Sequence, residues 1–369
     1  MIVKTVMIIH RWTDQDPRCN KIIRFLLKND YKVIFLGIKT QDAITDDTIL
    51  SDKYTRILYY QKNNSRICVA LNFIQYVFFI VKNIFLYKPY IIHCVNEEVA
   101  FLALLLKNIK YKIIVLDIFD SLILRINKNQ KYYEGVKVIT KLVYKRSDYI
   151  IVTDEARMKL LPQYLHKKTL VVYNTPDVNE SIDFSFRVNN IFTIGVIGSI
   201  SQKKGLKELL CAIENIDGIR IDCFGILADE YSRNVFIKNP KVFYKGMFSN
   251  EIAIQETAKC DLIFAFYEPS TLNNIYASPN KLFEAMYLGK PILMNSEVKM
   301  SKIISENDFG GIVPYYSVDG IKKVIKRYKE MDRKKYEELF YKERNFYCGY
   351  FAWENSKNNL LKIYKRLSE

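Results

Sequence analysis

A lysine stands at an unfavourable position in the segment ASPNKLFEAMYLGKPIL, Ala277–Leu293. The segment predicts a short helix that is capped by Ser278 and has Pro279 at its first position. Lys281 then lies in the first turn, where the helix dipole is already positive, and Glu284 lies one turn further along the same face. A bound anion would reverse the repulsion, so the segment predicts an anion site at this helix N-terminus.

A second lysine, Lys204, lies at another expected helix start, after the glycine-containing strand FTIGVIG, Phe192–Gly198. Taken alone, it is as easily part of a basic surface loop. In an open α/β sheet, however, the carboxyl ends of the strands and the N-termini of the helices face one crevice. Lys204 and Lys281 together therefore favour a diphosphate ligand. Glu284 repels phosphate but suits the paired hydroxyls of a ribose, although a lone glutamate on a helix is more often simply solvated.

Apolar runs alternate with helix-length segments along nearly the whole chain, which is typical of parallel α/β sheets. We expect two doubly wound domains, 1–175 and 190–345, joined by a polar linker, 176–189, and followed by an amphipathic helix within 346–369. One face of that helix would carry Trp353, Leu360, Leu361, Tyr364 and Leu367. The expected strands are VKTVMII, YKVIFLGI, YIIHCV, KIIVLDI, YIIVTD and TLVVYN, then FTIGVIG, IRIDCFGI, KVFYKG, CDLIFAFY, PILMN and GGIVPY.

The charge and the cysteine and histidine content of the chain limit the kinds of partner and ligand that it can bind. The 369 residues carry 56 Lys and Arg against 40 Asp and Glu, a net charge of +16, which predicts attraction to a phosphorylated substrate, a membrane surface or a nucleic acid. We expect no nucleic acid, because no RNA- or DNA-binding motif is visible and the lysines are scattered. Seven cysteines without a CxxC pair indicate reduced thiols, and three histidines without ligand spacing lead us to expect no metal site.

The segment Ile67–Tyr87 is long and apolar, but Lys82 and three amides interrupt it, so it does not fit a transmembrane helix. Two interpretations stay open. The segment is either a helix buried against the first sheet or an interfacial helix, flanked by Arg66 and Lys88, that lies on an anionic membrane surface.

The segment SPNKLFEAMYLGKPIL closely resembles the signature of the family-4 retaining glycosyltransferases, which have the GT-B fold, and among them the bacterial surface-polysaccharide type. Other segments follow in the order of that family: DPRCNKIIRFLLKNDYKVIFLG, PYIIHC, VLDIFDS, VVYNTPD, GVIGSISQKKG, FYKGMFSNEI and AWENSKNNLLKIYKRL. The resemblance covers nearly the whole chain. It implies two Rossmann-like domains with a cleft between them and a last helix that crosses back to the first domain.

The resemblance also implies roles for individual residues. Lys204 would contact the donor diphosphate, Glu284 the ribose, and the loop 246–248 the nucleobase. Lys204, Glu284 and Asp120 are the implied catalytic residues, with Asp120 touching sugar or acceptor. The acceptor would contact Asp16, Arg18 and His93 in the first domain. The donor site as a whole would comprise Gly198, Ser199, Lys204, Gly246, Met247, Phe248, Tyr276, Ser278, Pro279, Asn280, Lys281 and Glu284.

Three positions depart from the family pattern. Tyr276 stands where many members have a first glutamate, Ser199 where an arginine is common, and Phe119 where a histidine is common. We interpret these as changes of specificity. They also leave open an alternative, a catalytically inactive partner subunit that binds a nucleotide sugar or glycan. A nucleic-acid binder ranks last, because only the charge favours it.

The resemblance implies transfer of a hexose-type sugar from a UDP- or GDP-linked donor, with retention and without a metal or other cofactor. The acceptor would be a glycan, lipid-linked in the synthesis of bacterial capsule, lipopolysaccharide O-antigen or exopolysaccharide. Such an enzyme is expected in the cytoplasm, at the inner face of the membrane.

Overall fold

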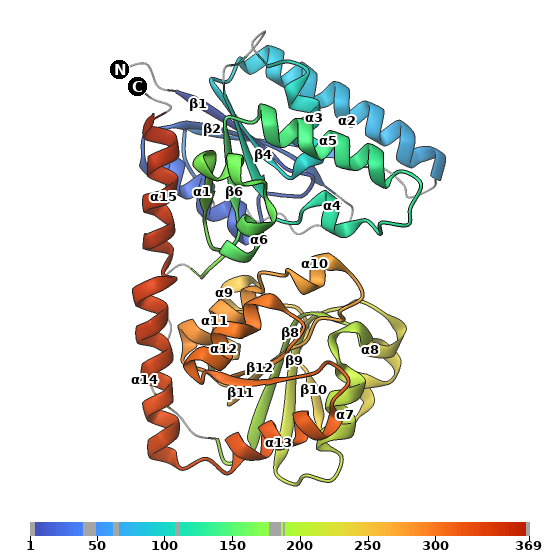
Figure 1. Cartoon of the computed structure of the whole chain (residues 1–369), viewed down its shortest axis with the longest axis vertical. Coiled ribbons are helices and arrows are strands. Elements are labelled where there is room, and N and C mark those ends of the chain that lie inside the picture. Colours follow the sequence, from blue (N-terminus) through green and yellow to red (C-terminus); the bar gives the residue numbers. More distant parts are fainter. Residues whose placement is uncertain are drawn as a thin grey trace. The chain divides into compact units, whose positions relative to one another are not determined.

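The computed structural model describes residues 4–39, 49–61, 66–107, 111, 113–176, 186 and 189–366, with only the backbone described for 66–71 and 366. The chain divides into two compact units, Met1–Tyr173 with Ser356–Glu369, and Asn174–Asn355 (Figure 1). Most of the predicted linker, 176–189, lies outside the described residues. The predicted domain limits stay predictions.

The first unit contains a seven-stranded parallel sheet in the order β3-β2-β1-β4-β5-β6-β7. The strand β3 was not among the expected strands, because its side chains are half-buried without a clear apolar run. The elements are β1 (Thr5–Ile9), α1 (Pro17–Lys28), β2 (Lys32–Lys39), β3 (Tyr54–Tyr60), α2 (Arg66–Tyr87), β4 (Ile91–Val95), α3 (Glu97–Leu104), β5 (Ile113–Ile118), α4 (Leu122–Arg125), α5 (Tyr133–Arg146), β6 (Tyr149–Val152), α6 (Glu155–Leu160), the 3₁₀ helix η1 (Gln163–Lys168) and β7 (Thr169–Val171).

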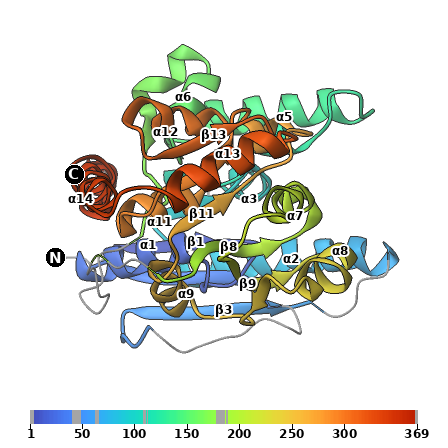
Figure 2. The same cartoon turned by 90° about the horizontal axis from the view of Figure 1, so that it is seen from below.

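The second unit contains a six-stranded parallel sheet in the order β10-β9-β8-β11-β12-β13. Helix α13 lies beside α7 in this unit (Figure 2). The elements are β8 (Phe192–Ile200), η2 (Gln202–Lys204), α7 (Leu206–Ile213), β9 (Ile219–Leu227), α8 (Glu230–Asn234), η3 (Phe236–Lys238), β10 (Val242–Tyr244), α9 (Asn250–Ala258), β11 (Leu262–Ala265), α10 (Leu272–Ile275), α11 (Asn280–Leu288), β12 (Ile292–Asn295), η4 (Lys299–Ser301), α12 (Lys302–Asn307), β13 (Gly310–Val313), α13 (Val318–Lys329) and α14 (Arg333–Tyr350).

Both sheets are doubly wound, which confirms the expected fold class. Each sheet starts in the middle, grows to one edge and then returns to grow towards the other, and right-handed crossovers therefore place helices on both faces. In the first unit, alternate residues such as Met7 and Ile9 pack under α2, α3 and α5. The residues between them point to the opposite face. On β4 and β5 that face carries His93 and Asp117, both fully buried.

The last helix, α15 (Trp353–Arg366), begins in the second unit and belongs to the first unit from Ser356 onward. Trp353, Leu360 and Tyr364 are buried, as expected from the sequence. Leu361 is half-exposed, because Ile363 takes its place on the buried face, so the predicted face is wrong there. Leu367 lies outside the described residues.

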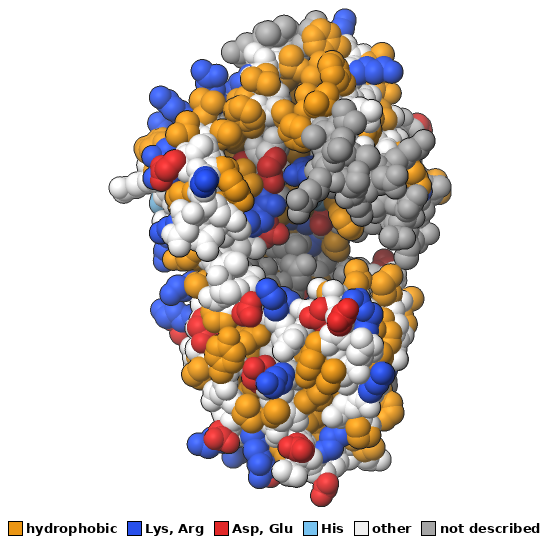
Figure 3. Space-filling model, turned by 90° about the vertical axis from the view of Figure 1, so that its right-hand side faces the viewer, with side chains coloured by type: hydrophobic (Ala, Val, Ile, Leu, Met, Phe, Trp, Pro, Cys, Tyr) orange, Lys and Arg blue, Asp and Glu red, His pale blue; other side chains and the backbone are white. Residues whose placement is uncertain are grey.

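Helix α2 packs one face against the first sheet, as in the first interpretation, and leaves its other face exposed. Tyr76, Ile80 and Ile84 pack against the sheet. Hydrophobic side chains, with Lys and Arg among them, gather on the upper part of the face that Figure 3 shows. None of the described helices is long and apolar enough to cross a membrane. The exposed apolar residues of α2, with their exposed fractions, are Phe73 (50%), Ile74 (50%), Phe78 (70%), Phe85 (44%) and Leu86 (63%).

Candidate active site

The crevice of the second unit is expected where its strand order reverses, between β8 and β11. The loop after β8 supplies Lys204, and the loop after β11 supplies Tyr267. The two meet directly, with Lys204 Nζ 3.7 Å from the centroid of the Tyr267 ring. A cation–π contact thus joins the two loops at the place where this fold class binds its ligands.

The surroundings of Lys204 disfavour the charged form of its side chain. Burial lowers the pKa of its ammonium group from 10.5 to about 8. It makes no ion pair with any residue that the structure describes. An anion beside it would stabilise the charged form and raise the pKa again, so its surroundings favour an anionic ligand.

The backbone around Lys204 is held from several sides. The Glu268 N–H donates to the Lys203 carbonyl at 3.1 Å, which ties the two loops together. Asn295, at the end of β12, pairs with both backbone groups of Tyr267, at 2.8 and 3.0 Å. Gly205 has a φ of +70° and a Cβ there would come within 2.8 Å of the Phe266 ring, so the turn after Lys204 requires glycine. These contacts orient the lysine before any ligand binds.

Helix α11 begins one residue later than expected. Its N-cap is Pro279, and no side chain caps it, so the prediction that Ser278 caps this helix is wrong. A proline side chain has no acceptor for the backbone N–H groups of the first turn. This end of α11 therefore presents uncapped N–H groups beside Lys281, which suits an anion more strongly than the predicted capped helix.

Lys281 and Glu284 form an ion pair, with 2.5 Å between Nζ and Oε2. Lys281 is half-buried, Glu284 is buried, and the aliphatic Cε of the lysine lies 3.8 Å from the position of a Cβ on Gly198. The carboxylate thus neutralises the misplaced lysine in the structure described. The role of Glu284 towards a ribose stays a prediction.

Glycines connect this pair to the loop after β10. Gly198 and Gly225 are paired across β8 and β9 so closely that a Cβ on Gly225 would lie 2.0 Å from the Gly198 carbonyl oxygen. The Gly225 N–H donates to the Gly246 carbonyl at 2.8 Å. Met247 and Phe248 follow, both exposed, and Phe248 packs on the buried ring of Phe224. An exposed apolar loop that these glycines join to the Gly198 region fits a planar ligand group.

The other predicted donor residues lie around these contacts. Ser199 is exposed near the end of β8, and Tyr276 follows α10 as its C-cap. The Asn280 amide oxygen accepts from Asn174 Nδ2 at 2.9 Å. Tyr267 and Asn295 were missed, although both stand at the carboxyl ends of expected strands, where the sequence could have pointed to them.

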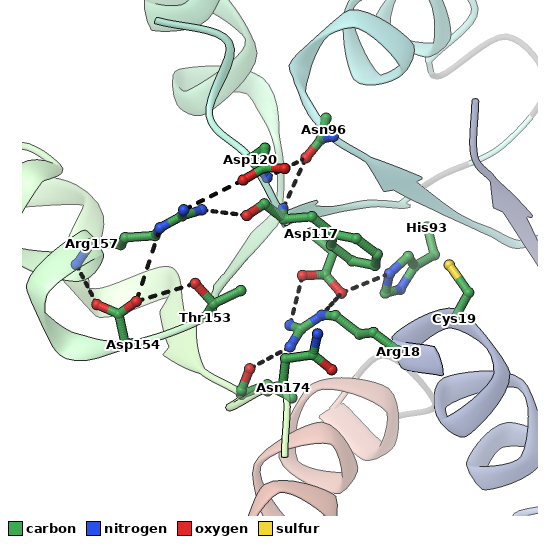
Figure 4. Close-up of polar contacts among 12 residues, drawn as sticks. Arg18, Cys19, His93, Asn96, Asp117, Asp120, Thr153, Asp154, Arg157 and Asn174 are labelled. Atoms are coloured by element: carbon green, nitrogen blue, oxygen red, sulfur yellow. Dashed lines mark hydrogen bonds and ion pairs between the residues drawn. The ribbon is translucent and has the colours of Figure 1, made fainter. Parts of the chain in front are cut away.

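The first unit has a buried charge network (Figure 4). Arg18 on α1 donates to both oxygens of Asp117, from NH2 at 2.8 Å and from Nε at 3.2 Å. His93 Nε2 lies 3.3 Å from Asp117, and His93 Nδ1 lies 2.6 Å from the hydroxyl of Tyr364 on α15. Burial alone raises the pKa of the Asp117 carboxyl, but Arg18 and His93 outweigh it and hold the pKa below its usual value.

Two of the predicted acceptor residues belong to this network. The side chains of Arg18 and His93 are fully buried, and each binds groups of the protein itself. They join α1 and α15 to the sheet, and their contact with an acceptor stays a prediction. Asp16 is half-exposed and caps α1 by accepting from the N–H groups of Arg18 and Cys19, both at 3.0 Å.

Asp120 has a different setting at the carboxyl end of β5 (Figure 4). Its side chain is 55% exposed, and its Oδ1 lies 3.5 Å from NH2 of Arg157. Asn96, which has a φ of +65°, accepts from the N–H groups of Phe119 and Asp120 at 2.8 and 3.1 Å. Asp120 is therefore an exposed carboxylate on a fixed turn, held by two residues, Asn96 and Arg157, that the sequence did not single out.

Comparison with solved structures identifies the architecture. The chain matches sucrose-phosphate synthase from Thermosynechococcus elongatus with a TM-score of 0.77 at 14% identity, over 99% of both chains. It matches HepE from Anabaena, solved with UDP and glucose, with a TM-score of 0.71 at 13% identity, over 98% of this chain and 100% of that chain. The match to the lipopolysaccharide outer core galactosyltransferase WaaB has a TM-score of 0.60 at 14% identity, over 99% of this chain and 100% of that chain.

These matches show that the chain has the GT-B fold, as the sequence predicted. A scan against protein-family models and a search of curated proteins found no match.

Proposed function

We propose that this protein is a retaining glycosyltransferase that moves a hexose-type sugar from a nucleotide-diphosphate sugar to a glycan acceptor. The observation that carries the proposal is the half-buried ammonium of Lys204, which has no ion-pair partner among the described residues and is held on Tyr267 at the reversal point of the second sheet. An enzyme that breaks a sugar–phosphate bond needs preorganised positive charge where the diphosphate leaves. The structural neighbours HepE and the trehalose-6-phosphate protein from E. coli, which were solved with UDP or a UDP-sugar, favour a UDP-linked donor.

The donor would bind along the edge formed by β8, β11 and α11. Its diphosphate would contact Lys204, Lys281 and the uncapped N–H groups of α11, and its base would lie against Met247 and Phe248. When the diphosphate takes Lys281 as a partner, Glu284 is released from its ion pair and accepts from the ribose hydroxyls. The two lysines and the helix N-terminus would stabilise the leaving group without a metal ion, and in a retaining reaction the leaving phosphate would help to deprotonate the acceptor.

The acceptor would be a lipid-linked glycan of bacterial capsule, O-antigen or exopolysaccharide synthesis, bound to the first unit near Asp16 and Asp120. The exposed apolar face of α2, with the exposed Lys82 and Lys88, supports contact with an anionic membrane surface. The protein would then work in the cytoplasm, at the inner face of the membrane.

Release of nucleotide diphosphate from a panel of UDP- and GDP-sugars tests the proposal. The Lys204→Ala and Glu284→Ala variants should each lose at least about tenfold in turnover, because each removes a group that binds the donor. Lys203→Ala is the matched control, since Lys203 is the neighbouring lysine but is 74% exposed and pairs with Glu268. Full turnover in both test variants would contradict the site.

The inactive-partner alternative gains support from the ion pair that neutralises Lys281 and from Tyr276 in place of a carboxylate. It predicts that a nucleotide sugar binds with no release or transfer for any acceptor tried. Calorimetric binding measured on the same donor panel distinguishes the two functions.

A further inference from the structure

The end of β1 carries a second cluster of chemically active side chains. His10 directly follows the strand, and Asp16 precedes α1, whose first turn contains Cys19. A ring nitrogen of His10, a carboxylate oxygen of Asp16 and the Sγ of Cys19 all lie within 4.8 Å of one another. His10 and Cys19 are buried and Asp16 is half-buried.

One ring nitrogen of His10 lacks a hydrogen bond within the described residues. Its Nδ1 is buried and has no hydrogen-bond partner among the residues that the structure describes. An imidazole nitrogen left without a partner in the interior costs free energy, and native structures normally satisfy such atoms. The imidazole that carries this nitrogen is the same one that lies beside the Cys19 thiol and the Asp16 carboxylate.

We infer that His10, Asp16 and Cys19 bind one divalent transition-metal ion of the zinc class. Imidazole nitrogen, thiolate sulfur and carboxylate oxygen are the three donors that Zn²⁺ prefers in proteins. The thiolate and the carboxylate together balance the charge of the ion, so a neutral centre replaces a buried thiol. Binding forms three metal–ligand bonds and releases the Cys19 proton to solvent, with no redox step. One coordination position stays open for water.

Metal binding requires the three ligand groups to move slightly closer together. Ligand atoms of a tetrahedral zinc ion lie about 3.4 Å apart, so the three groups must approach each other by roughly 1 Å. Asp16 can serve twice, because Oδ1 accepts both N–H groups of the helix cap and leaves Oδ2 for the metal. Carboxylates of Asp117 and Glu98 also act on His10, which adds to the attraction for a cation.

Hydrogen bonds to β2 and β3 hold the loop between the ligands. The Ile38 N–H donates to the Trp12 carbonyl at 3.2 Å, and the Tyr54 hydroxyl donates to Asp14 at 2.7 Å. A metal that joins the end of β1 to α1 would fix this loop, whose Trp12 is 54% exposed. The centre lies in the first unit, so it is separate from the donor groups proposed above and its test does not depend on them.

Titration of the full chain with Co²⁺, after treatment with a chelator, tests the site. We expect one Co²⁺ per chain, a thiolate-to-cobalt charge-transfer band, and displacement of the cobalt by Zn²⁺. Cys19→Ser should abolish the band. Asp16→Asn should weaken Co²⁺ binding about tenfold or more while keeping the fold, because asparagine caps helices as well as aspartate does.

Cys94→Ser is the matched control, because Cys94 is an equally buried thiol in the same unit. Its cobalt band should equal that of the unmodified chain. No cobalt band in the unmodified chain, a band that persists in Cys19→Ser, or the same loss in Cys94→Ser would each overturn the proposal. Circular dichroism of every variant separates loss of the metal ligand from loss of the fold. If Cys19→Ser does not fold, the Co²⁺ affinity of Asp16→Asn is the test, and an unchanged affinity would overturn the proposal.

Discussion

Lys204 is held in its site at a cost to stability. Its pKa is lowered to about 8, so the unfolded chain binds more protons than the folded chain between pH 8 and 10.5, and the free energy of unfolding should rise with pH through that window. Replacing the cation by an apolar side chain removes the cost. We expect Lys204→Met to raise the free energy of unfolding at pH 7 by about 1 kcal/mol, after the lost cation–π contact is deducted. Denaturant titration at pH 7 and pH 10 measures this.

The same pKa predicts how binding depends on pH. Lys204 in the empty site is protonated below about pH 8 and neutral above it. Binding of UDP should therefore weaken as the pH rises from 7 to 9, because more of the protein must first take up a proton. Lys204→Arg should bind with little change over this range, since arginine stays charged. A pH-independent affinity in the unmodified protein, measured by calorimetry, would argue against Lys204 as the phosphate contact.

Arg18, in contrast to Lys204, is a buried charge that stabilises the fold. Removing it would leave the Asp117 carboxylate buried with only His93 beside it, so we expect Arg18→Leu to lower the free energy of unfolding by about 3–5 kcal/mol. The double variant Arg18→Leu with Asp117→Leu should be less destabilised than the single variant. Arg24→Leu, at an exposed position of the same helix, is the control and should cost less than about 0.5 kcal/mol in a urea titration.

Helix α2 carries the prediction for the membrane. Its exposed phenylalanines give it affinity for a lipid interface and contribute little to the core, so Phe78→Ser should leave the thermal midpoint nearly unchanged. The same change should lower co-sedimentation with anionic vesicles by about tenfold, because a buried phenylalanine side chain contributes roughly 1.5–3 kcal/mol. Tyr341→Ser, an exposed aromatic of the second unit, is the control. Equal loss in both variants would show that the contact is not specific to α2.

The elements that the sequence predicted well are those with a single dominant signal. Apolar runs such as KIIVLDI became strands because a strand that is buried on both faces leaves an unbroken hydrophobic run in the sequence. The strand β3 escaped prediction because an edge strand need not be apolar. The start of α11 shifted by one residue because proline at the N-cap and at the first helical position leave nearly the same sequence pattern.

Prediction of the site was limited by burial, which spacing alone does not reveal. Lys281 and Glu284 were correctly placed on one helical face, and the structure shows that they pair. A polar residue on a helix or strand points either to the solvent or into the interior, and Arg18 on α1 and His93 on β4 point inward. Contacts between distant segments, such as Lys204 with Tyr267, depend on the strand order, which the sequence does not state.

The last two helices of the chain end in different units, and this predicts how the chain unfolds. Tyr364 on α15 is buried in the first unit against His93 and Tyr31, whereas Tyr347 on α14 is buried in the second unit with its hydroxyl on the Pro176 carbonyl. Each unit has a sheet and a hydrophobic core of its own, so a large cavity in one should not lower the local stability of the other by the same amount.

We therefore expect Tyr364→Ala to accelerate hydrogen exchange of the strands β1 and β4 and to leave β8 and β11 nearly unchanged, while Tyr347→Ala does the reverse. Each substitution should cost about 3–5 kcal/mol in the unit that loses the ring, because it removes a fully buried aromatic side chain. Leu361→Ala, a half-exposed neighbour of Tyr364, is the control and should change little. If both tyrosine variants accelerated exchange equally in both sheets, the units would unfold as one cooperative body, and the crossover helix would be the element that couples them.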